Sequence, residues 1–351
     1  MIRADRITFR TMEKQLDAFY MTWQGNGTGC WLFDTLAPTV AAEDDGVMKI
    51  LMIGQSHAQD TVWLLYDVLK AQLPQEEFLV MDVYRSTNLD EHVQNIKNRA
   101  PLYDCYENSN GTVVHTPNVT ITDMIMRENW DLIVFNEAAW NQTQEEHYND
   151  GDFAFMIDHI RSYAQPGYKL GYNATWAQPV TKMLYEADRR PAPASFRSQF
   201  TQYFGGDRLA HYAQITAMMK KYIEPNPDFD IVFHSGTAIQ YASETHGVPE
   251  AEVNRSYELY RDYTHLSDFG RLLVAYQWYA QIYGLEALTE VKVERIPRAM
   301  RATSREQAFG DVVITDAHKE AIIASVNFAL AHPNETPEQV VRQTAILEPI
   351  N

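Results

Sequence analysis

The residues best suited to chemistry in this sequence are a serine and a histidine that lie far apart along the chain. Ser56 follows the mostly apolar run VMKILMIG at 47–54, and helical spacing begins directly after it. A serine at such a strand-to-helix turn has its Oγ exposed above the sheet, and its own N–H lies at the positive end of a helix. That N–H is placed to donate to a developing oxyanion. Ser56 is therefore a candidate nucleophile.

The stretch YRDYTHLSDFGRLLVAY at 260–276 offers a base for this serine. Asp262 and His265 lie three residues apart, so the carboxylate can reach one imidazole nitrogen while the other nitrogen points at Ser56. The aspartate would hold the tautomer and stabilise the imidazolium, and the histidine would take the serine proton. The pattern predicts a triad in which Ser56 is the nucleophile, His265 the base and Asp262 the orienting acid.

Each of these patterns also has a purely structural interpretation. A Gly-x-Ser sequence after a strand is common, and Ser56 could simply cap the helix that follows. Asp-x-x-His is also common, and a lone histidine is more often structural or exposed than catalytic. Placement along the chain favours catalysis, because Ser56 follows the first core strand and the Asp-His pair follows the last one.

Alternating strands and helices are the elements that must position these groups. Mostly apolar runs predict strands, and helical spacing predicts helices. The strands are expected at 47–54, 77–84, 130–140, 168–176 and 230–236, and the helices at 58–72, 90–99, 206–223, 270–284 and 315–332. A short helix is expected to begin at Thr122, and Asn110-Gly111 predicts a hairpin turn. The pattern is typical of a three-layer α/β/α sandwich with a mostly parallel central sheet of about five strands.

The chain has no internal repeat and no low-complexity segment, so one α/β domain is the simplest interpretation of its 351 residues. We expect an N-terminal extension at 1–46, the α/β domain at 47–335 and a C-terminal tail at 336–351. Apolar residues predict that the extension packs on the body or on a partner subunit, and the second arrangement would make a homodimer. These residues are Trp23, Trp31, Leu32 and Phe33.

Several segments resemble the SGNH (GDSL-like) hydrolase superfamily, which has its serine in the first block and Asp-x-x-His in the last. The resemblance is closer to one branch, an SGNH-like domain of unknown function common in gut bacteria, whose first block looks like Lys-Ile-Leu-x-Ile-Gly-Asn-Ser-Phe-Ser-x-Asp. The matching segments here are KILMIGQSHAQD, NVTITDMIMRENWDLIVFNEA, YNATWAQP, IVFHSGTAIQYA and RDYTHLSDFGRLLVAYQW, in the expected order across about 47–285. The resemblance implies an SGNH/flavodoxin-like fold and a serine hydrolase.

The resemblance also implies an oxyanion hole with three donors. The first is the N–H of Ser56. The second is usually a glycine N–H after the second strand, and the nearest position here is Ser86, where glycine is absent. The third is normally an asparagine side chain, which falls on Asn136, although this branch more often has glutamine there. An amide carries the required N–H donors. The alternative role of Asn136 is that of a turn former at a strand end.

Four further residues are candidates for contact with substrate. His57 either lines the pocket or is an exposed residue at a helix start, and the second interpretation is favoured. Glu137 either contacts substrate or faces water. Trp140 and Trp176 either form an apolar wall for an acyl or sugar group or belong to the buried core.

The expected function is hydrolysis of a small, acetyl-like acyl ester on a carbohydrate or small molecule, through a covalent acyl-enzyme. This chemistry needs no metal and no organic cofactor. The alternative is a carbohydrate- or ligand-binding protein on the same scaffold with little or no turnover, which the missing glycine near Ser86 suggests. A phosphate- or nucleotide-binding protein is disfavoured, because GQSHAQ has too few glycines for either fingerprint.

Charge and composition exclude several classes of partner. The formal net charge of −18 argues against a nucleic-acid or anionic-membrane surface. Two cysteines make neither a disulfide framework nor a zinc site and fit a reducing compartment. The N-terminus lacks an apolar signal region, and no stretch approaches the roughly 20 apolar residues of a membrane span. We therefore expect a cytoplasmic protein.

Overall fold

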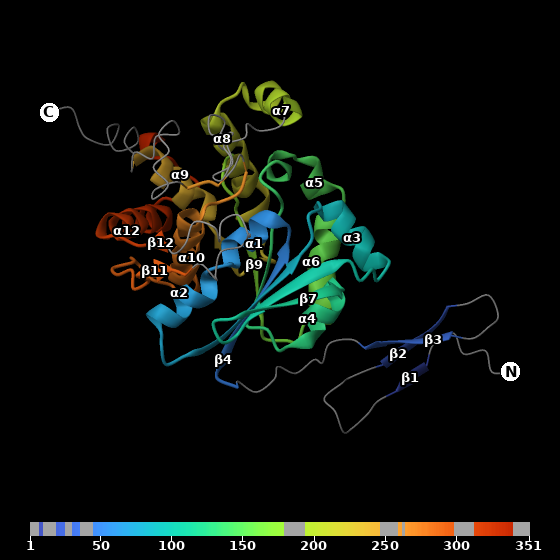
Figure 1. Ribbon diagram of the computed structural model, residues 1–351. Coiled ribbons are helices and arrows are strands. Elements are labelled where there is room, and N and C mark those ends of the chain that lie inside the picture. Colours follow the sequence, from blue (N-terminus) through green and yellow to red (C-terminus); the bar gives the residue numbers. More distant parts are fainter. Residues whose placement is uncertain are drawn as a thin grey trace.

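The computed structural model describes residues 45–178, 194–245, 259–261, 264–297 and 312–339, together with three short strands before residue 36. A seven-stranded sheet in the order β10-β9-β8-β4-β5-β6-β7 forms its centre (Figure 1). Five of these strands are parallel and lie within the five predicted apolar runs. They are β4 (Val47–Gly54), β5 (Glu77–Tyr84), β8 (Leu132–Phe135), β9 (Lys169–Asn173) and β10 (Ile231–Phe233). The predicted fold class is confirmed.

An antiparallel hairpin extends the sheet beyond the five strands that were expected. Its strands β6 (Tyr103–Asn108) and β7 (Val113–Val119) flank the predicted Asn110-Gly111 turn. Gly111 has a φ of +83°, and its N–H donates to Asn108 Oδ1 at 2.9 Å. Such a φ suits glycine because glycine has no Cβ to clash. Strand β7 lies at the edge of the sheet and is mostly exposed.

Side chains along each central strand alternate between two cores, one on each face of the sheet. In β4, Ile50 and Met52 join one core, while Leu51 and Ile53 join the other. The first face is covered by α1 (Ser56–Val62), α2 (Leu65–Gln72), α9 (Ser235–Thr245), α10 (Asp268–Ile282) and α12 (Asp316–Ala331). The second is covered by α3 (Leu89–Lys97), α4 (Ile121–Arg127), α6 (Asp152–Tyr163) and α8 (Arg208–Met218) (Figure 1). These are the three predicted layers.

Two predicted helices differ from the observed ones. The helix expected at 58–72 is two helices, α1 and α2, with a break at Trp63 and Leu64. In one continuous helix Leu64 would point about 200° away from Val62, whereas the break lets both side chains bury in the same core. Helix α4 begins at Ile121 and not at Thr122, because the Thr120 hydroxyl accepts a hydrogen bond from the N–H of Asp123 and caps the helix.

Shorter elements complete the described chain. They are η1 (Asn141–Thr143), α5 (Glu146–Asn149), α7 (Ala194–Phe204), the π-helical turn η2 (Met219–Ile223) and the antiparallel pair β11 (Arg295–Ile296) and β12 (Val312–Val313). The N-terminal extension contains a separate antiparallel sheet of β1 (Ile7–Phe9), β2 (Phe19–Gln24) and β3 (Cys30–Thr35). The four side chains expected to dock this extension lie outside the described side chains, as does most of the predicted tail at 336–351. Docking and homodimer formation stay predictions.

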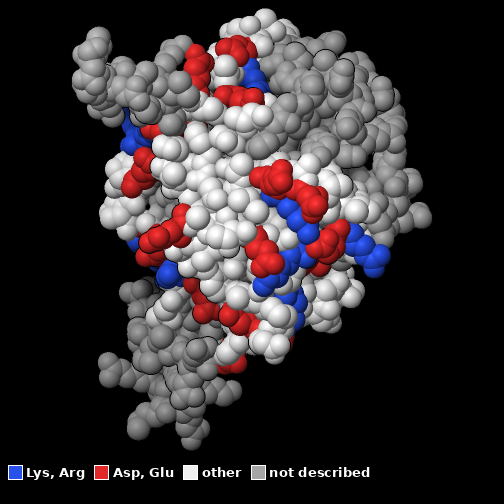
Figure 2. Space-filling view, turned by 90° about the vertical axis from the view of Figure 1, so that its left-hand side faces the viewer, with Lys and Arg blue, Asp and Glu red and all other residues white. Residues whose placement is uncertain are grey.

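The described surface is rich in acidic side chains. On the face in Figure 2 they form several separate groups around a broad area with no charged side chains, and basic side chains lie among them mainly on one side. Within the described part of the chain, no helix combines the length and the apolar character needed to cross a membrane. Nor does that part bring together three or more His, Cys, Asp or Glu residues that could hold a metal ion.

Candidate active site

The strongest candidate for chemistry lies where β4 passes into α1. Ser56 is the first residue of α1, and its Oγ lies 2.8 Å from Nε2 of His265, 209 residues further along the chain. Both side chains are partly exposed, so solvent and substrate can reach them. An imidazole nitrogen hydrogen-bonded to a hydroxyl is placed to remove its proton. The structure thus brings together two of the three residues that were predicted to form a triad.

Helix α1 is capped by Gln55 and not by Ser56. Gln55 Oε1 accepts hydrogen bonds from the N–H groups of His57 at 2.7 Å and Ala58 at 3.4 Å. These groups are among the first N–H donors of the helix, which lack partners within the helix itself. The alternative in which Ser56 serves only as a helix cap is therefore wrong, and its hydroxyl faces His265 instead.

Gly54 allows the end of β8 to approach the end of β4 closely. A Cβ atom at position 54 would lie 2.7 Å from Cβ of Ala58 and 2.8 Å from Oδ1 of Asn136. Real Cβ atoms do not tolerate such distances. The absence of a side chain at Gly54 therefore lets the Asn136 amide lie against the turn that carries Ser56.

The amide of Asn136 is buried, yet neither its Nδ2 nor its Oδ1 has a hydrogen-bond partner within the described part of the chain. Buried amides are normally satisfied, and an unsatisfied one costs about 1–3 kcal/mol. An oxyanion donor must be fixed in place before charge develops on the substrate. The Asn136 amide lies beside the turn that carries Ser56 and fits that requirement, and its role as an oxyanion donor stays a prediction.

Ser86 lies in the loop between β5 and α3, and this loop touches the end of β4. The N–H of Arg85 donates to the carbonyl of Gly54 at 3.0 Å, and the N–H of Thr87 donates to the carbonyl of Arg85 at 2.8 Å. The Ser86 N–H makes no hydrogen bond to any residue that the structure describes. Of these three N–H groups, only that of Ser86 is open to a substrate oxygen.

A short loop before α10 carries His265. Its base is an antiparallel bridge between Tyr260 and Leu266, and the N–H of Arg261 donates to the carbonyl of His265 at 3.0 Å. The Trp176 indole donates to the carbonyl of Thr264 at 3.0 Å. Asp262 lies in this loop but outside the described residues. Its role as the orienting acid stays a prediction.

The two tryptophans with predicted substrate contacts have different environments. Trp176 is fully buried and belongs to the core, where its indole N–H holds the His265 loop through the carbonyl of Thr264. Trp140 is partly exposed, and its ring lies edge-to-face with Tyr203 at 4.9 Å and with Phe204 at 5.4 Å. Tyr203 is itself exposed. Trp140 therefore remains a candidate for contact with substrate.

His57 is buried, which corrects the favoured interpretation of an exposed residue at a helix start. The reason is that the loop of His265 folds over the start of α1. The two imidazole rings are stacked with centroids 5.8 Å apart, and Nε2 of His57 lies 2.9 Å from Oγ1 of Thr264. That hydroxyl also accepts from Nε2 of Gln178 at 2.7 Å. His57 thus packs directly against the candidate base.

Glu137 is also buried, so the interpretation in which it faces water is wrong, while its contact with substrate stays a prediction. Its Oε1 accepts the N–H of Leu89 at 3.0 Å, at the start of α3. The positive end of a helix attracts a carboxylate, which explains the placement. Burial nevertheless dominates, and it raises the pKa of Glu137 to about 7. The carboxyl group connects the end of β8 to the segment that follows Ser86.

The raised pKa of Glu137 predicts a pH-dependent stability. The folded protein holds this proton more tightly than the unfolded chain, so the free energy of unfolding should fall as pH rises from the usual value of 4.5 toward about 7. Glu137→Gln should abolish up to about 3 kcal/mol of this fall. Urea unfolding at pH 5, 6, 7 and 8 would measure it, with exposed Glu146→Gln as the control. Equal slopes for the wild type and Glu137→Gln would contradict the expectation.

Asp60 is a residue of this site to which the sequence analysis assigned no role. It lies one turn after Ser56 and is fully buried. Its Oδ1 accepts from Arg261 Nη1 at 2.8 Å and from Arg271 Nε and Nη2 at 2.9 and 2.8 Å, and its Oδ2 accepts from the N–H of Leu266 at 2.8 Å. Burial alone would raise the pKa of Asp60, but the two guanidinium groups hold it well below its usual range. The sequence carried one signal for this residue: Asp60 lies four residues after Ser56, at the last position of the matching segment KILMIGQSHAQD.

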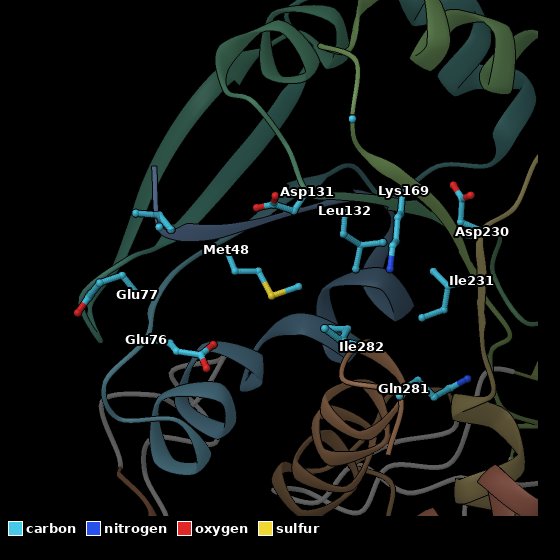
Figure 3. A pocket seen from close by; sticks show the side chains of 14 residues that line it. Met48, Glu76, Glu77, Asp131, Leu132, Lys169, Asp230, Ile231, Gln281 and Ile282 are labelled. Carbon is cyan, nitrogen blue, oxygen red and sulfur yellow. The ribbon is translucent and has the colours of Figure 1, made fainter. Parts of the chain in front are cut away.

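A separate cavity of about 760 Å³ lies at the opposite edge of the sheet, where the parallel strands begin (Figure 3). Its walls include apolar side chains of Met48, Leu132 and Ile231, with Lys169 and several carboxylates beside them. None of the predicted site residues lines it. Ligands of open α/β sheets bind at the carboxyl ends of the strands, so we place the candidate active site at Ser56 and not in this cavity.

Comparison with solved structures supports the fold. The chain is similar to a DUF4886 family protein from Bacteroides uniformis ATCC 8492, with 22% sequence identity and a TM-score of 0.62. The match covers 84% of this chain and 99% of that one. At this identity the likeness shows a shared fold and nothing about activity.

A second structure is less similar. It is a protein from Slackia heliotrinireducens described as "a putative SGNH hydrolase", with 17% identity, a TM-score of 0.41, and coverage of 67% of this chain and 99% of that one. A likeness with so low a TM-score shows neither a shared fold nor a shared function. None of the curated proteins compared with the chain matches it.

The family comparison is more decisive. A family model described as Domain of unknown function (DUF4886) matches residues 49–309, which is most of the chain and includes both Ser56 and His265. This confirms the resemblance to a branch defined by a domain of unknown function. The chain therefore belongs to the DUF4886 family.

Proposed function

We propose that this protein is a serine hydrolase that cleaves a small acyl ester carried by a carbohydrate or small molecule. The observation that carries the proposal is the 2.8 Å contact between Ser56 Oγ and His265 Nε2 at the carboxyl edge of a parallel sheet. The unpartnered amide of Asn136 beside the same turn supports it. A base, a nucleophile and an open donor are the minimum set for acyl transfer.

The reaction follows from these positions. His265 Nε2 accepts the hydroxyl proton as Ser56 Oγ attacks the ester carbonyl. The tetrahedral oxyanion accepts hydrogen bonds from the N–H groups of Ser56 and Ser86 and from Nδ2 of Asn136. His265 then protonates the leaving alcohol, and an acyl-enzyme remains on Ser56. Water, activated by His265, attacks this ester and releases the acid, while Asp262 orients the imidazole throughout.

The nature of the substrate is proposed from the resemblance to SGNH hydrolases, with support from one feature of the site. Trp140 follows the end of β8 closely along the chain, and its ring contacts that of exposed Tyr203 from α7, so the two present an aromatic surface. Aromatic rings with a polar edge suit ligands that are partly apolar and partly hydroxylated. This favours a sugar or another ring as the alcohol portion and leaves the small acyl group for the space beside Ser56.

The non-catalytic alternative rests on the missing glycine at Ser86. That argument is weakened by the Ser86 N–H, which is open in the described structure without any glycine. The contact between Ser56 and His265 also has no evident use in a protein that only binds a ligand. We therefore favour the hydrolase.

The test of this function is covalent labelling of the folded wild type with a fluorophosphonate probe, followed by peptide mass spectrometry. Turnover of p-nitrophenyl acetate and acetate release from acetylated sugars are measured in parallel. We expect the label on the peptide containing Ser56, together with ester turnover. A folded protein that takes no label and hydrolyses no ester would support the binding protein instead.

A further inference from the structure

We propose that Asp60 is the positioning residue of this site: it fixes the loop that carries His265 to the helix that carries Ser56, and its negative charge stabilises the protonated form of His265. The inference deepens the proposed hydrolase and rests on it. Asp60 touches neither substrate nor the reacting atoms. It acts through His265, and its four hydrogen bonds carry the argument.

Helix α1 sets the distance between nucleophile and base. Ser56 and Asp60 are four residues apart, so they lie on one face of the helix about 6 Å apart along its axis. Ser56 Oγ meets the His265 ring, while Asp60 Oδ2 accepts the N–H of Leu266, the next residue in the loop. The ring and the backbone of the base are thus held by two points of one rigid turn. The loop cannot slide along α1 without breaking both contacts.

The Asp60 carboxylate also connects the start of the His265 loop to α10, the helix that follows this loop. Arg261, at the start of the loop, and Arg271, in α10, both donate to Asp60 Oδ1. Arg271 is fully buried and also donates to Asp268 Oδ1 at 3.3 Å. A buried charge held by several charge-assisted hydrogen bonds has little freedom to move. The hydrogen bonds between Asp60 and the two arginines therefore hold the His265 loop in one position before substrate binds.

Charge balance in this cluster gives Asp60 a second effect. The two guanidinium groups are balanced by the carboxylates of Asp60 and Asp268, and His265 lies close enough for its charge to interact with Asp60. Asp82, on β5, is buried, and burial together with the nearby Asp60 charge raises its pKa well above the usual value, which favours its neutral form. Loss of the Asp60 charge would leave an excess positive charge that opposes protonation of His265.

The test compares the wild type with Asp60→Asn and with the double variant Asp60→Asn/Arg261→Gln. In Asp60→Asn we expect kcat for p-nitrophenyl acetate to fall about 10- to 100-fold with KM changed by less than about threefold, because a displacement near 1 Å costs on the order of 10²-fold. The pKa of His265, measured by NMR titration of its Cε1–H, should fall by about 0.5–1 unit. The double variant removes one positive charge as well, so this pKa should return toward the wild-type value while kcat stays low.

The matched control is Asp67→Asn, which removes a partly buried carboxyl group from α2. It should leave both kcat and the pKa of His265 unchanged. A kcat for Asp60→Asn within about twofold of the wild type, or a lowered kcat with an unchanged pKa, overturns the proposal and reduces Asp60 to a stabiliser of the fold. Thermal unfolding checks each variant. If Asp60→Asn does not fold, kcat of the double variant decides, and a value within about twofold of the wild type overturns the proposal. A wild type without ester turnover would instead refute the hydrolase, while the NMR titration would still test Asp60.

Discussion

Replacing Ser56 by alanine is expected to reduce ester turnover by about 10⁴-fold or more and to abolish labelling by a fluorophosphonate. The substitution removes the atom that would form the acyl-enzyme. The fold should be nearly unaffected, because Ser56 is partly exposed and Gln55 caps the helix in its place. Loss of the single hydrogen bond to His265 should change the free energy of unfolding by about 1 kcal/mol or less.

Ser235 provides a matched control for this experiment. It follows β10 at the same edge of the sheet, but it is fully buried and its hydroxyl donates to Asn173 Oδ1 at 2.7 Å. Ser235→Ala should lower the free energy of unfolding by about 1–3 kcal/mol and leave turnover within a few-fold of the wild type. The reverse pattern, with activity lost in Ser235→Ala and kept in Ser56→Ala, would show that the nucleophile has been assigned to the wrong strand.

Asn136→Ala is expected to lower kcat by about 10²–10³-fold while the melting temperature stays the same or rises. A catalytic donor is stronger in the transition state than in the ground state, so its loss affects kcat more than KM. The amide has no hydrogen-bond partner within the described residues, so its removal breaks no interaction with them and relieves a buried polar group. Steady-state kinetics and thermal unfolding on the same samples would measure the two effects.

Asn173, at the end of the neighbouring strand β9, is the matched control. Its amide is buried like that of Asn136, but its Oδ1 accepts from Ser235 and Trp278 and its Nδ2 donates to Thr61. Asn173→Ala should therefore destabilise the fold by about 2–4 kcal/mol and leave kcat near the wild-type value in the folded fraction. An Asn136→Ala variant with normal kcat and lowered stability would identify Asn136 as a structural residue.

Much of the fold could be predicted because its signals are local. Each parallel strand is an apolar run that needs no knowledge of its neighbours, and Asn110-Gly111 identified the hairpin through the backbone preference of glycine. The meeting of Ser56 and His265 was also predictable in outline. Ser56 directly follows β4 and so lies at the carboxyl edge of the sheet, whereas His265 lies before α10 and is separated from β10 by α9. The order of the matching segments was therefore what indicated the meeting.

What could not be predicted depends on pairings across long stretches of chain. The bonds between Asp60 and the arginines join residues 201 and 211 positions apart, and nothing in the local pattern distinguishes this carboxylate from an exposed one. The same applies to His57 and Glu137, which appear polar and exposed in sequence. Their burial depends on the loop that folds over α1 and on the start of α3.

The hairpin that extends the sheet also affects how the protein behaves in concentrated solution. The last strand of a sheet presents N–H and C=O groups on which strands of other molecules can align. In β7 this alignment is interrupted, because Pro117 has no N–H and Asn118 adopts a left-handed φ of +60° where the register with β6 shifts. The opposite edge, β10, has only three residues. Both borders of the sheet are thus poor templates for aggregation, and the net charge of −18 adds repulsion between molecules.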